Sequence, residues 1–137
     1  MDYALTATVE QPYDQTVAKT REALAGQGFG ILTEIDIRAT MREKLDVDVL
    51  PQVILGACRP PLAHAALQAE PSIGLLLPCN VVVRALDDAT TLVEAVNPDL
   101  MVALTGNAKL RTIADEATKR LGLALDSLDP HRVERKE

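Results

Sequence analysis

The side chains best suited to chemistry in this sequence are two cysteines and a histidine, spaced C-x5-H-x14-C as Cys58, His64 and Cys79. They include every cysteine of the chain, and the other histidine lies near its C-terminal end. Thiolate sulfur and imidazole nitrogen are ligands that suit zinc or copper. The spacing matches no established zinc motif, and a fourth ligand must come from Glu34 or Asp36, from water or from a second chain.

Two other interpretations fit the same residues. Free cysteine is among the most buried residue types and packs as a small apolar side chain, and both cysteines here have aliphatic neighbours, in "LGAC" and "PCNVVV". A thiol can also serve a redox reaction or carry a sulfur species where its thiolate is favoured. The sequence therefore leaves structural cysteines, a thiol site and a metal site open.

The predicted elements place the two thiols in different surroundings. Cys58 ends a predicted strand, and the two prolines after Arg59 fix the entry of a helix over residues 62–69. The positive field at a helix N-terminus favours a thiolate at Cys58 and lets Arg59 meet an anion there. His64 falls on the first or second turn of this helix, within reach of Cys58. Cys79 follows a proline break between two predicted strands.

Other polar residues give weaker signals. Glu34 and Asp36 fall on one face of a predicted strand, where two carboxylates can serve proton transfer, although acids that alternate on an exposed strand are more often only solvated. Asn80 fits a turn better than the orientation of a base. Serine is almost absent, and no phosphate-binding loop, G-x-S-x-G or H-E-x-x-H motif occurs. An enzyme is the least supported class of function.

Apolar periodicity predicts the elements that carry these side chains. Alternation indicates a strand over residues 29–37, in which Phe29, Ile31, Thr33 and Ile35 are expected to share one face. Further strands are expected at 2–10, at 53–57, at 73–83 with a break at Pro78, and, after a turn at 87–90, at 91–96. Helices are expected from Pro12 to the glycines at 26–28, over 41–45 behind a Thr40 capping box, over 62–69, over 98–104, and in a last segment carrying Leu110 to Leu121.

This order of elements predicts an α+β fold of the β-α-β4-α type, with a largely antiparallel sheet and helices packed on one face. A chain of 137 residues is long enough to bury its own core. We expect one domain over residues 1–126. The charged segment 127–137 is expected to form a flexible tail.

Charge and composition exclude several partners. The net charge is −6, and the basic residues are scattered among acids, so neither nucleic acid nor an anionic membrane is an expected partner. No secretory signal opens the chain, and its longest apolar stretch, 73–83, is too short to span a bilayer. The expected location is the cytosol, where both thiols would stay reduced.

Three segments resemble a known family: "GFGILTEIDIRATMREKL" (28–45), "ILGACRPPLAHAAL" (54–67) and "GLLLPCNVVVR" (74–84). Together they are similar to the small prokaryotic proteins grouped as domain of unknown function 302, over roughly residues 1–125. The resemblance implies a β-α-β4-α topology related to half of a TATA-box-binding protein, and two chains paired as a homodimer. It implies neither DNA binding nor an established activity.

Three functions follow, in decreasing order of support. The first is a homodimeric cytosolic binding or sensing module in which Cys58, His64 and Cys79 hold a metal, a sulfur species or a small ligand. The second is a structural or interaction protein whose cysteines belong to the core. The third is a thiol-dependent redox or sulfur-handling enzyme. The mutual distances of the three side chains distinguish the first function from the second.

Overall fold

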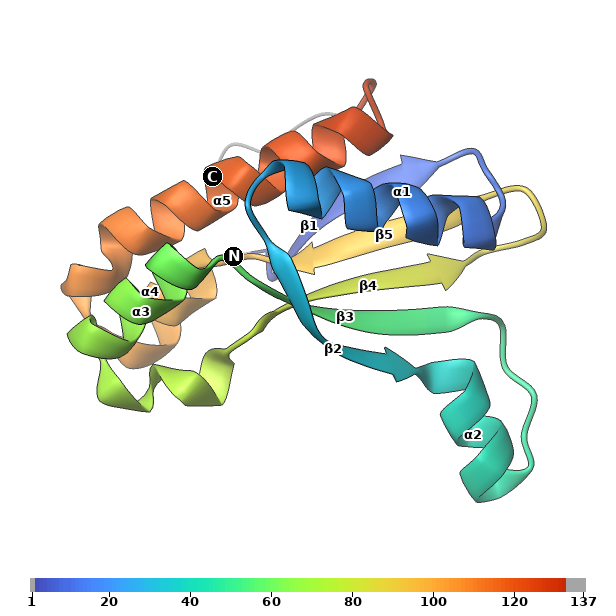
Figure 1. The fold of residues 1–137 in the computed structure, drawn as a ribbon, viewed down its shortest axis with the longest axis horizontal. Helices are drawn as coiled ribbons and strands as arrows, with labels where there is room; N and C mark the ends of the chain where they lie inside the picture. The colour runs from blue at the N-terminus through green and yellow to red at the C-terminus, as the bar shows by residue number, and fades with distance from the viewer. Residues whose placement is uncertain (1, 133–137) are drawn as a thin grey trace.

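A five-stranded antiparallel sheet is the centre of the computed structural model, which describes residues 2–132 (Figure 1). Its strands lie in the order β1-β5-β4-β3-β2 and are β1 (Ala4–Val9), β2 (Gly30–Asp36), β3 (Gln52–Cys58), β4 (Cys79–Ala85) and β5 (Thr91–Val96). The helices are α1 (Tyr13–Gly26), α2 (Ile37–Leu45), α3 (Pro60–Ala69), α4 (Asp99–Thr105) and α5 (Arg111–Leu128), with 3-10 turns η1 (Pro71–Leu76) and η2 (Ala108–Leu110). The predicted α+β class is confirmed.

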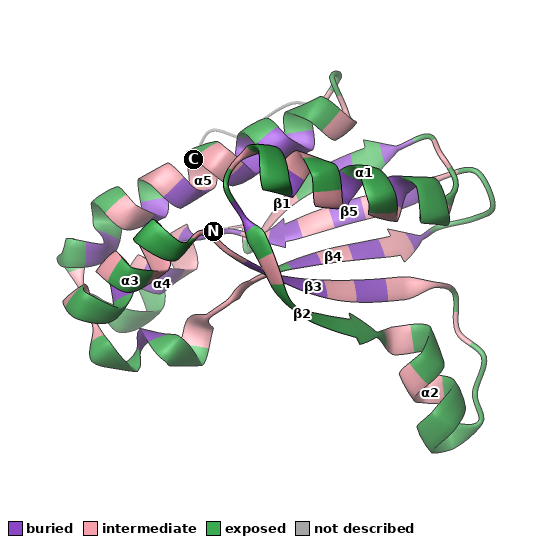
Figure 2. Cartoon of the chain, in the orientation of Figure 1, coloured by how far each residue is buried: buried purple, intermediate pink, exposed green. Residues whose placement is uncertain are grey.

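Period-two alternation explains the main core. In β4 and β5 every second residue is buried, as Val83 and Val93 are. The helices α1 and α5 lie across this face of the sheet (Figure 1), and their residues Leu24 and Leu121 belong to the same buried cluster. Figure 2 shows the result as alternating buried and half-buried bands along the strands. The long helices therefore share one face, as predicted.

The opposite side of the sheet, here called the open face, carries an apolar stripe. Ile35 of β2 lies opposite Ile54 of β3, which in turn lies opposite Val82 of β4. Ile35 is 46 % exposed, and the other two side chains are half-buried. Beside the stripe, Arg84 Nε pairs with Glu94 Oε1 at 3.3 Å. Since α1 and α5 cover only the other face, this stripe remains accessible.

A β-bulge in β2 makes the predicted facing of that strand wrong. Ile31 lies opposite Ala57 of β3, but the next paired residue, Thr33, lies opposite Gly56. One extra residue in β2 therefore shifts the alternation. Because neighbours in β3 point to opposite faces, Ile31 faces the helices, whereas Thr33 and Ile35 face the open side.

The helix α2 begins four residues before the predicted start, because Asp36 and not Thr40 caps it. The Ala39 backbone N–H donates to Asp36 Oδ1 at 2.9 Å, the arrangement of a helix N-cap. The Thr40 hydroxyl donates instead to the Asp36 carbonyl oxygen at 2.8 Å. The predicted strand consequently ends at Asp36 and the helix starts at Ile37.

The strand predicted before Pro78 is also wrong, since this stretch is the 3-10 turn η1. Its first residue is Pro71, and Gly74 lies inside it; both residue types disfavour a strand interior. The apolar run is explained by burial on one side only, because Ile73 is 1 % exposed and packs into a second cluster. The peptide bond between Leu77 and Pro78 is cis, and β4 starts directly after it.

This second cluster lies beyond the end of the sheet, where α3, η1, α4 and the start of α5 gather (Figure 1). Its buried members come from five separate elements and are Ala66, Ile73, Met101, Leu110 and Ala114. Together with the sheet core it defines the space in which the candidate site lies.

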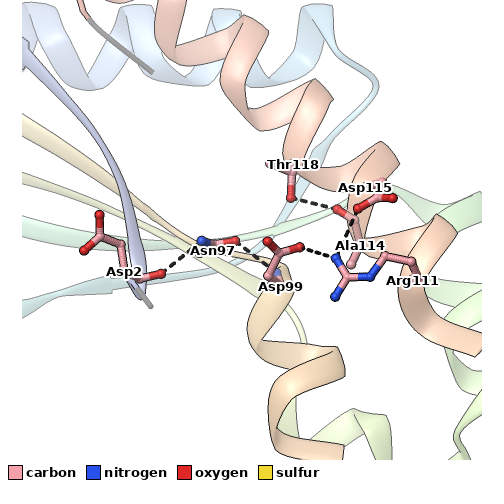
Figure 3. A network of polar contacts seen from close by, with 7 residues as sticks. All are labelled: Asp2, Asn97, Asp99, Arg111, Ala114, Asp115 and Thr118. Atoms are coloured by element: carbon pink, nitrogen blue, oxygen red, sulfur yellow. Dashed lines mark hydrogen bonds and ion pairs between the residues drawn. The ribbon is translucent and has the colours of Figure 1, made fainter. Parts of the chain in front are cut away.

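A polar network fixes α4 and α5 to the end of the sheet (Figure 3). The buried Asn97 side chain donates to the Asp2 carbonyl oxygen at 2.9 Å and accepts from the Asp99 backbone N–H at 3.0 Å. Arg111 Nη1 then donates to Asp99 Oδ1 at 2.9 Å and to Asp115 Oδ1 at 3.2 Å. The network therefore joins the starts of β1, α4 and α5.

The last helix continues past residue 126 to Leu128. Beyond it, Asp129 Oδ2 accepts a hydrogen bond from the Thr8 backbone N–H at 3.2 Å. The predicted flexible tail lies partly outside the described residues, which end at 132, and remains a prediction. Within residues 2–132, no helix has both the length and the apolar character needed to cross a membrane.

Candidate functional site

Strand pairing brings the two cysteines to one end of the sheet. Cys58 is the last residue of β3 and Cys79 the first of β4. These strands are antiparallel neighbours in which Ala57 lies directly opposite Cys79. The two cysteines, more than 20 residues apart along the chain, thus lie at neighbouring positions of adjacent strands, with a register offset of one residue. Both thiols are free and half-buried.

Both cysteines line a cavity of about 350 Å³ between the sheet core and the second cluster. Its walls come from the ends of β3 and β4, from α3, from η1 and the segment after it, and from α4 and α5. Nearly all of the lining is apolar: Phe29, Leu32, Ala57, Cys58, Arg59, Leu62, Ala63, Ala66, Leu67, Gly74, Leu77, Pro78, Cys79, Met101, Ile113 and Ala117. Both cysteine residues therefore border a space.

Arg59 is positioned at this cavity by the start of α3. It is the N-cap residue in an extended conformation, followed by two prolines in the first helical turn, where the missing N–H groups cost nothing. Its Nε donates to the carbonyl oxygen of Gln27 at 3.2 Å. The next residue, Gly28, has φ +83°, and a Cβ there would come within 3.0 Å of Arg59 Nε. Gly28 thus permits both the turn and the close approach of the guanidinium.

The electrostatics at Cys79 differ from those of a reactive thiol. Burial raises the pKa of Cys79 from 9.0 to about 11, and the neighbouring Cys58 adds a smaller contribution in the same direction. Cys79 is therefore a neutral thiol at physiological pH. A neutral S–H suits an apolar wall better than nucleophilic attack.

His64 does not join the two cysteines. It is exposed on α3 and is not part of the cavity lining. Among residues 2–132, no group of three or more His, Cys, Asp or Glu side chains is arranged to hold a metal ion. The structure consequently does not assemble Cys58, His64 and Cys79 into the zinc or copper site that their spacing left open.

Of the other polar residues considered from the sequence, only one lies at the cavity. Arg59 lines the cavity, whereas Asn80 is exposed at the start of β4. Glu34 pairs with Arg21 on the surface, and Asp36 caps α2. The two carboxylates thus have structural partners and lie outside the cavity lining.

Comparison with known proteins places the chain in a family. The sequence profile described as "Domain of unknown function DUF302" matches residues 5–128, which include every helix and strand except the first residue of β1. The chain belongs to the DUF302 family. A crystal structure of an uncharacterized conserved DUF302 protein from Bacillus stearothermophilus is similar to it, with a TM-score of 0.85 and 29 % identity over 93 % of this chain and 99 % of the other. No curated protein matches the chain.

Membership of the DUF302 family explains the fold but supplies no activity, so the site has to be judged on its geometry. Sequence reasoning found Cys58, Cys79 and Arg59, and it missed the walls contributed by Met101 and Ile113. Those residues look like ordinary core positions of two later helices. Their spacing gave no signal that they border a space.

Proposed function

We propose that this DUF302 protein is a binding module for a small apolar ligand held in the cavity at the end of the sheet. The observation that carries the proposal is the cavity itself, which has a volume of about 350 Å³. Among the described residues that line it, only Arg59 has a charged side chain. Ligand pockets are typically concave, largely apolar and about 300–1,000 Å³ in volume. Removal of apolar ligand surface from water would drive the binding.

The cysteines support binding more than thiol chemistry. The raised pKa of Cys79 keeps it protonated at neutral pH, and no described imidazole lines the cavity to serve as a base. The alternative of purely structural cysteines is less favoured, because both side chains border open volume. A thiol-dependent redox enzyme remains the second alternative, since two cysteines border the same space. The cytosolic location stays a prediction.

Filling the cavity should abolish binding of a neutral apolar probe. We expect N-phenyl-1-naphthylamine to bind the wild-type protein with enhanced fluorescence, and Ala63→Phe to weaken this binding at least tenfold. Ala63 is half-buried and lines the cavity, so the new ring can occupy the probe's space. The matched control is Ala65→Phe, at a half-buried position of the same helix that is not part of the lining.

Fluorescence titration of the three proteins, with circular dichroism to verify folding, measures the effect. The proposal predicts equal affinity for wild type and Ala65→Phe. Absence of probe binding to the wild type, or equal binding to all three proteins, would remove the cavity as a ligand site and leave the structural alternative.

We also propose that two copies pair through the open face. The stripe of Ile35, Ile54 and Val82 crosses three adjacent strands, whereas a solvated sheet face usually carries polar side chains. A two-fold axis through the stripe would let it cover the same stripe of the partner. Residues 73–76 do not extend this stripe, because they belong to the turn η1.

A charge placed in the stripe should separate the copies. We expect light scattering at micromolar concentration to give the mass of two chains for the wild type and of one chain for Val82→Asp, since pairing would bury two unpartnered carboxylates. The control Thr112→Asp adds the same charge at an exposed position of α5 and should remain paired. A single-chain mass for the wild type would contradict the proposal.

A further inference from the structure

The charge of the cavity wall narrows the class of ligand. Arg59 is the only Asp, Glu, Lys or Arg among the described lining residues, and it is half-buried. An apolar space with one cationic group at its border matches a ligand with an apolar body and one anionic end. Neither a neutral hydrocarbon nor an amine would use the guanidinium.

The guanidinium retains donors for such a group. Its Nε donates to the Gln27 carbonyl oxygen, and within residues 2–132 the Arg59 side chain makes no other hydrogen bond or ion pair. Glu116 is close enough for the Arg59 charge to help lower its pKa, but the main cause of that lowering is the hydrogen bond from Arg120. Arg120 Nε donates to Glu116 Oε2 at 2.6 Å, so this carboxylate already has its own partner.

The single positive charge of the site favours a carboxylate over a phosphate. One guanidinium offers one positive charge and a planar pair of donors, which matches the two oxygens of a carboxylate. A phosphate monoester carries nearly two charges at neutral pH, and the described lining contains no second cation.

The volume sets the length of the apolar part. A cavity of about 350 Å³ holds on the order of a dozen groups the size of water, at roughly 30 Å³ each. A methylene group is of similar size, so an unbranched chain of about eight to ten carbons would fill the space with its carboxylate at Arg59.

We infer that the ligand is an aliphatic carboxylate of medium chain length, with its chain in the cavity and its carboxylate paired to Arg59. This inference rests on the proposed function. The cysteines, with a neutral Cys79 thiol, then serve as part of the apolar wall against which the chain packs.

The test compares eight-carbon aliphatic compounds that carry different end groups. Octanoate, octan-1-ol, octylamine and octyl phosphate are each titrated calorimetrically into the full-length protein. We expect octanoate to bind roughly tenfold more tightly than octan-1-ol, because a charge-assisted pair is added to the same chain contacts. Octyl phosphate should bind less tightly than octanoate, and octylamine should bind most weakly of all.

Variants of Arg59 then assign the preference to this residue. Arg59→Gln should remove the tenfold advantage of octanoate and leave the affinity for octan-1-ol within about twofold. Arg59→Lys keeps the charge without the planar fork and should retain part of the advantage. The control Arg38→Gln makes the same change of net charge at an exposed position of α2 and should leave all affinities unchanged. Octanol binding also reports that each variant is folded.

The two levels of the hypothesis fail differently. If neither N-phenyl-1-naphthylamine nor any octyl compound binds, the proposed function itself is wrong. If octan-1-ol binds as tightly as octanoate, or if Arg59→Gln leaves the octanoate advantage intact, the cavity binds ligands but the carboxylate inference is overturned. Tighter binding of octyl phosphate than of octanoate would likewise overturn the choice of a carboxylate.

Discussion

Native alkylation with iodoacetamide at pH 8 is expected to modify Cys58 well before Cys79, and to modify Cys79 about 100-fold more slowly than in denaturant. The thiolate is the reacting species. Burial raises the pKa of Cys79 from 9.0 to about 11. At a pH below both of these pKa values, this shift lowers the thiolate population about 100-fold. Peptide mass mapping at successive times measures both rates in one sample.

The pH dependence gives this prediction a second, independent readout. A raised pKa means that the folded state holds its proton to higher pH. The rate for native Cys79 should therefore still rise about tenfold per unit between pH 8 and pH 10, whereas in denaturant it should level off near the ordinary value of 9.0. Cys58→Ser is the matched control, because it removes the smaller contribution of the neighbouring thiol and should leave most of the shift in place.

Two outcomes would contradict this picture. Equal protection of the two cysteines in the native protein would return both to the role of packed core residues. Equal and rapid labelling would show that Cys79 is not shielded by its surroundings. Because a bound metal would also protect both thiols, the measurement is repeated after chelation, and the slower reaction of Cys79 should persist.

The sequence correctly predicted the elements whose apolar pattern arises only from burial of one side. Alternation at residues 91–96 and helical spacing in α5 both reflect burial on one side, so their positions were correct. The predicted facing of the β2 side chains was wrong, because one extra residue in a β-bulge reverses which face they point to. The sequence of β2 still alternates regularly and does not reveal the bulge. The strand predicted at 73–77 was wrong for a related reason. Apolar residues indicate that a segment is buried, but they do not indicate whether it is a strand or a helical turn.

The candidate site was predictable only in part, and for a different reason. Cys58, Cys79 and Arg59 were found because their chemistry marks them wherever they lie. Their meeting at a cavity depends on the register of β3 and β4, which hydrophobic pattern restricts but does not fully specify. The empty volume depends on how side chains such as Met101 and Ile113 fit together. Complementarity of shape has no periodic signature in a sequence.

Gly56→Ala should lower the free energy of unfolding by about 3 kcal/mol, a typical cost of overpacking a well-packed site. Gly56 lies in β3 between Thr33 of β2 and Asn80 of β4. A Cβ there would overlap the Thr33 hydroxyl and would come within 2.7 Å of Pro78 Cγ. The control is Gly26→Ala, at the end of α1, where a Cβ meets nothing within 4 Å. This control should change stability by no more than about 1 kcal/mol, in the stabilising direction.

The two overlaps at Gly56 can be separated because one is adjustable and the other is not. Thr33→Ala removes the hydroxyl, so the double variant with Gly56→Ala should recover about half of the loss, measured by urea unfolding as a double-mutant cycle. The remaining loss would come from Pro78, whose ring cannot rotate away. Because Pro78 lines the cavity and precedes Cys79, the double variant should also alkylate Cys79 faster than the wild type does. The prediction would be contradicted if Gly56→Ala were as stable as Gly26→Ala. In that case β2 would move to accommodate the new methyl group, and the close approach of β2 and Pro78 to Gly56 would have no structural role.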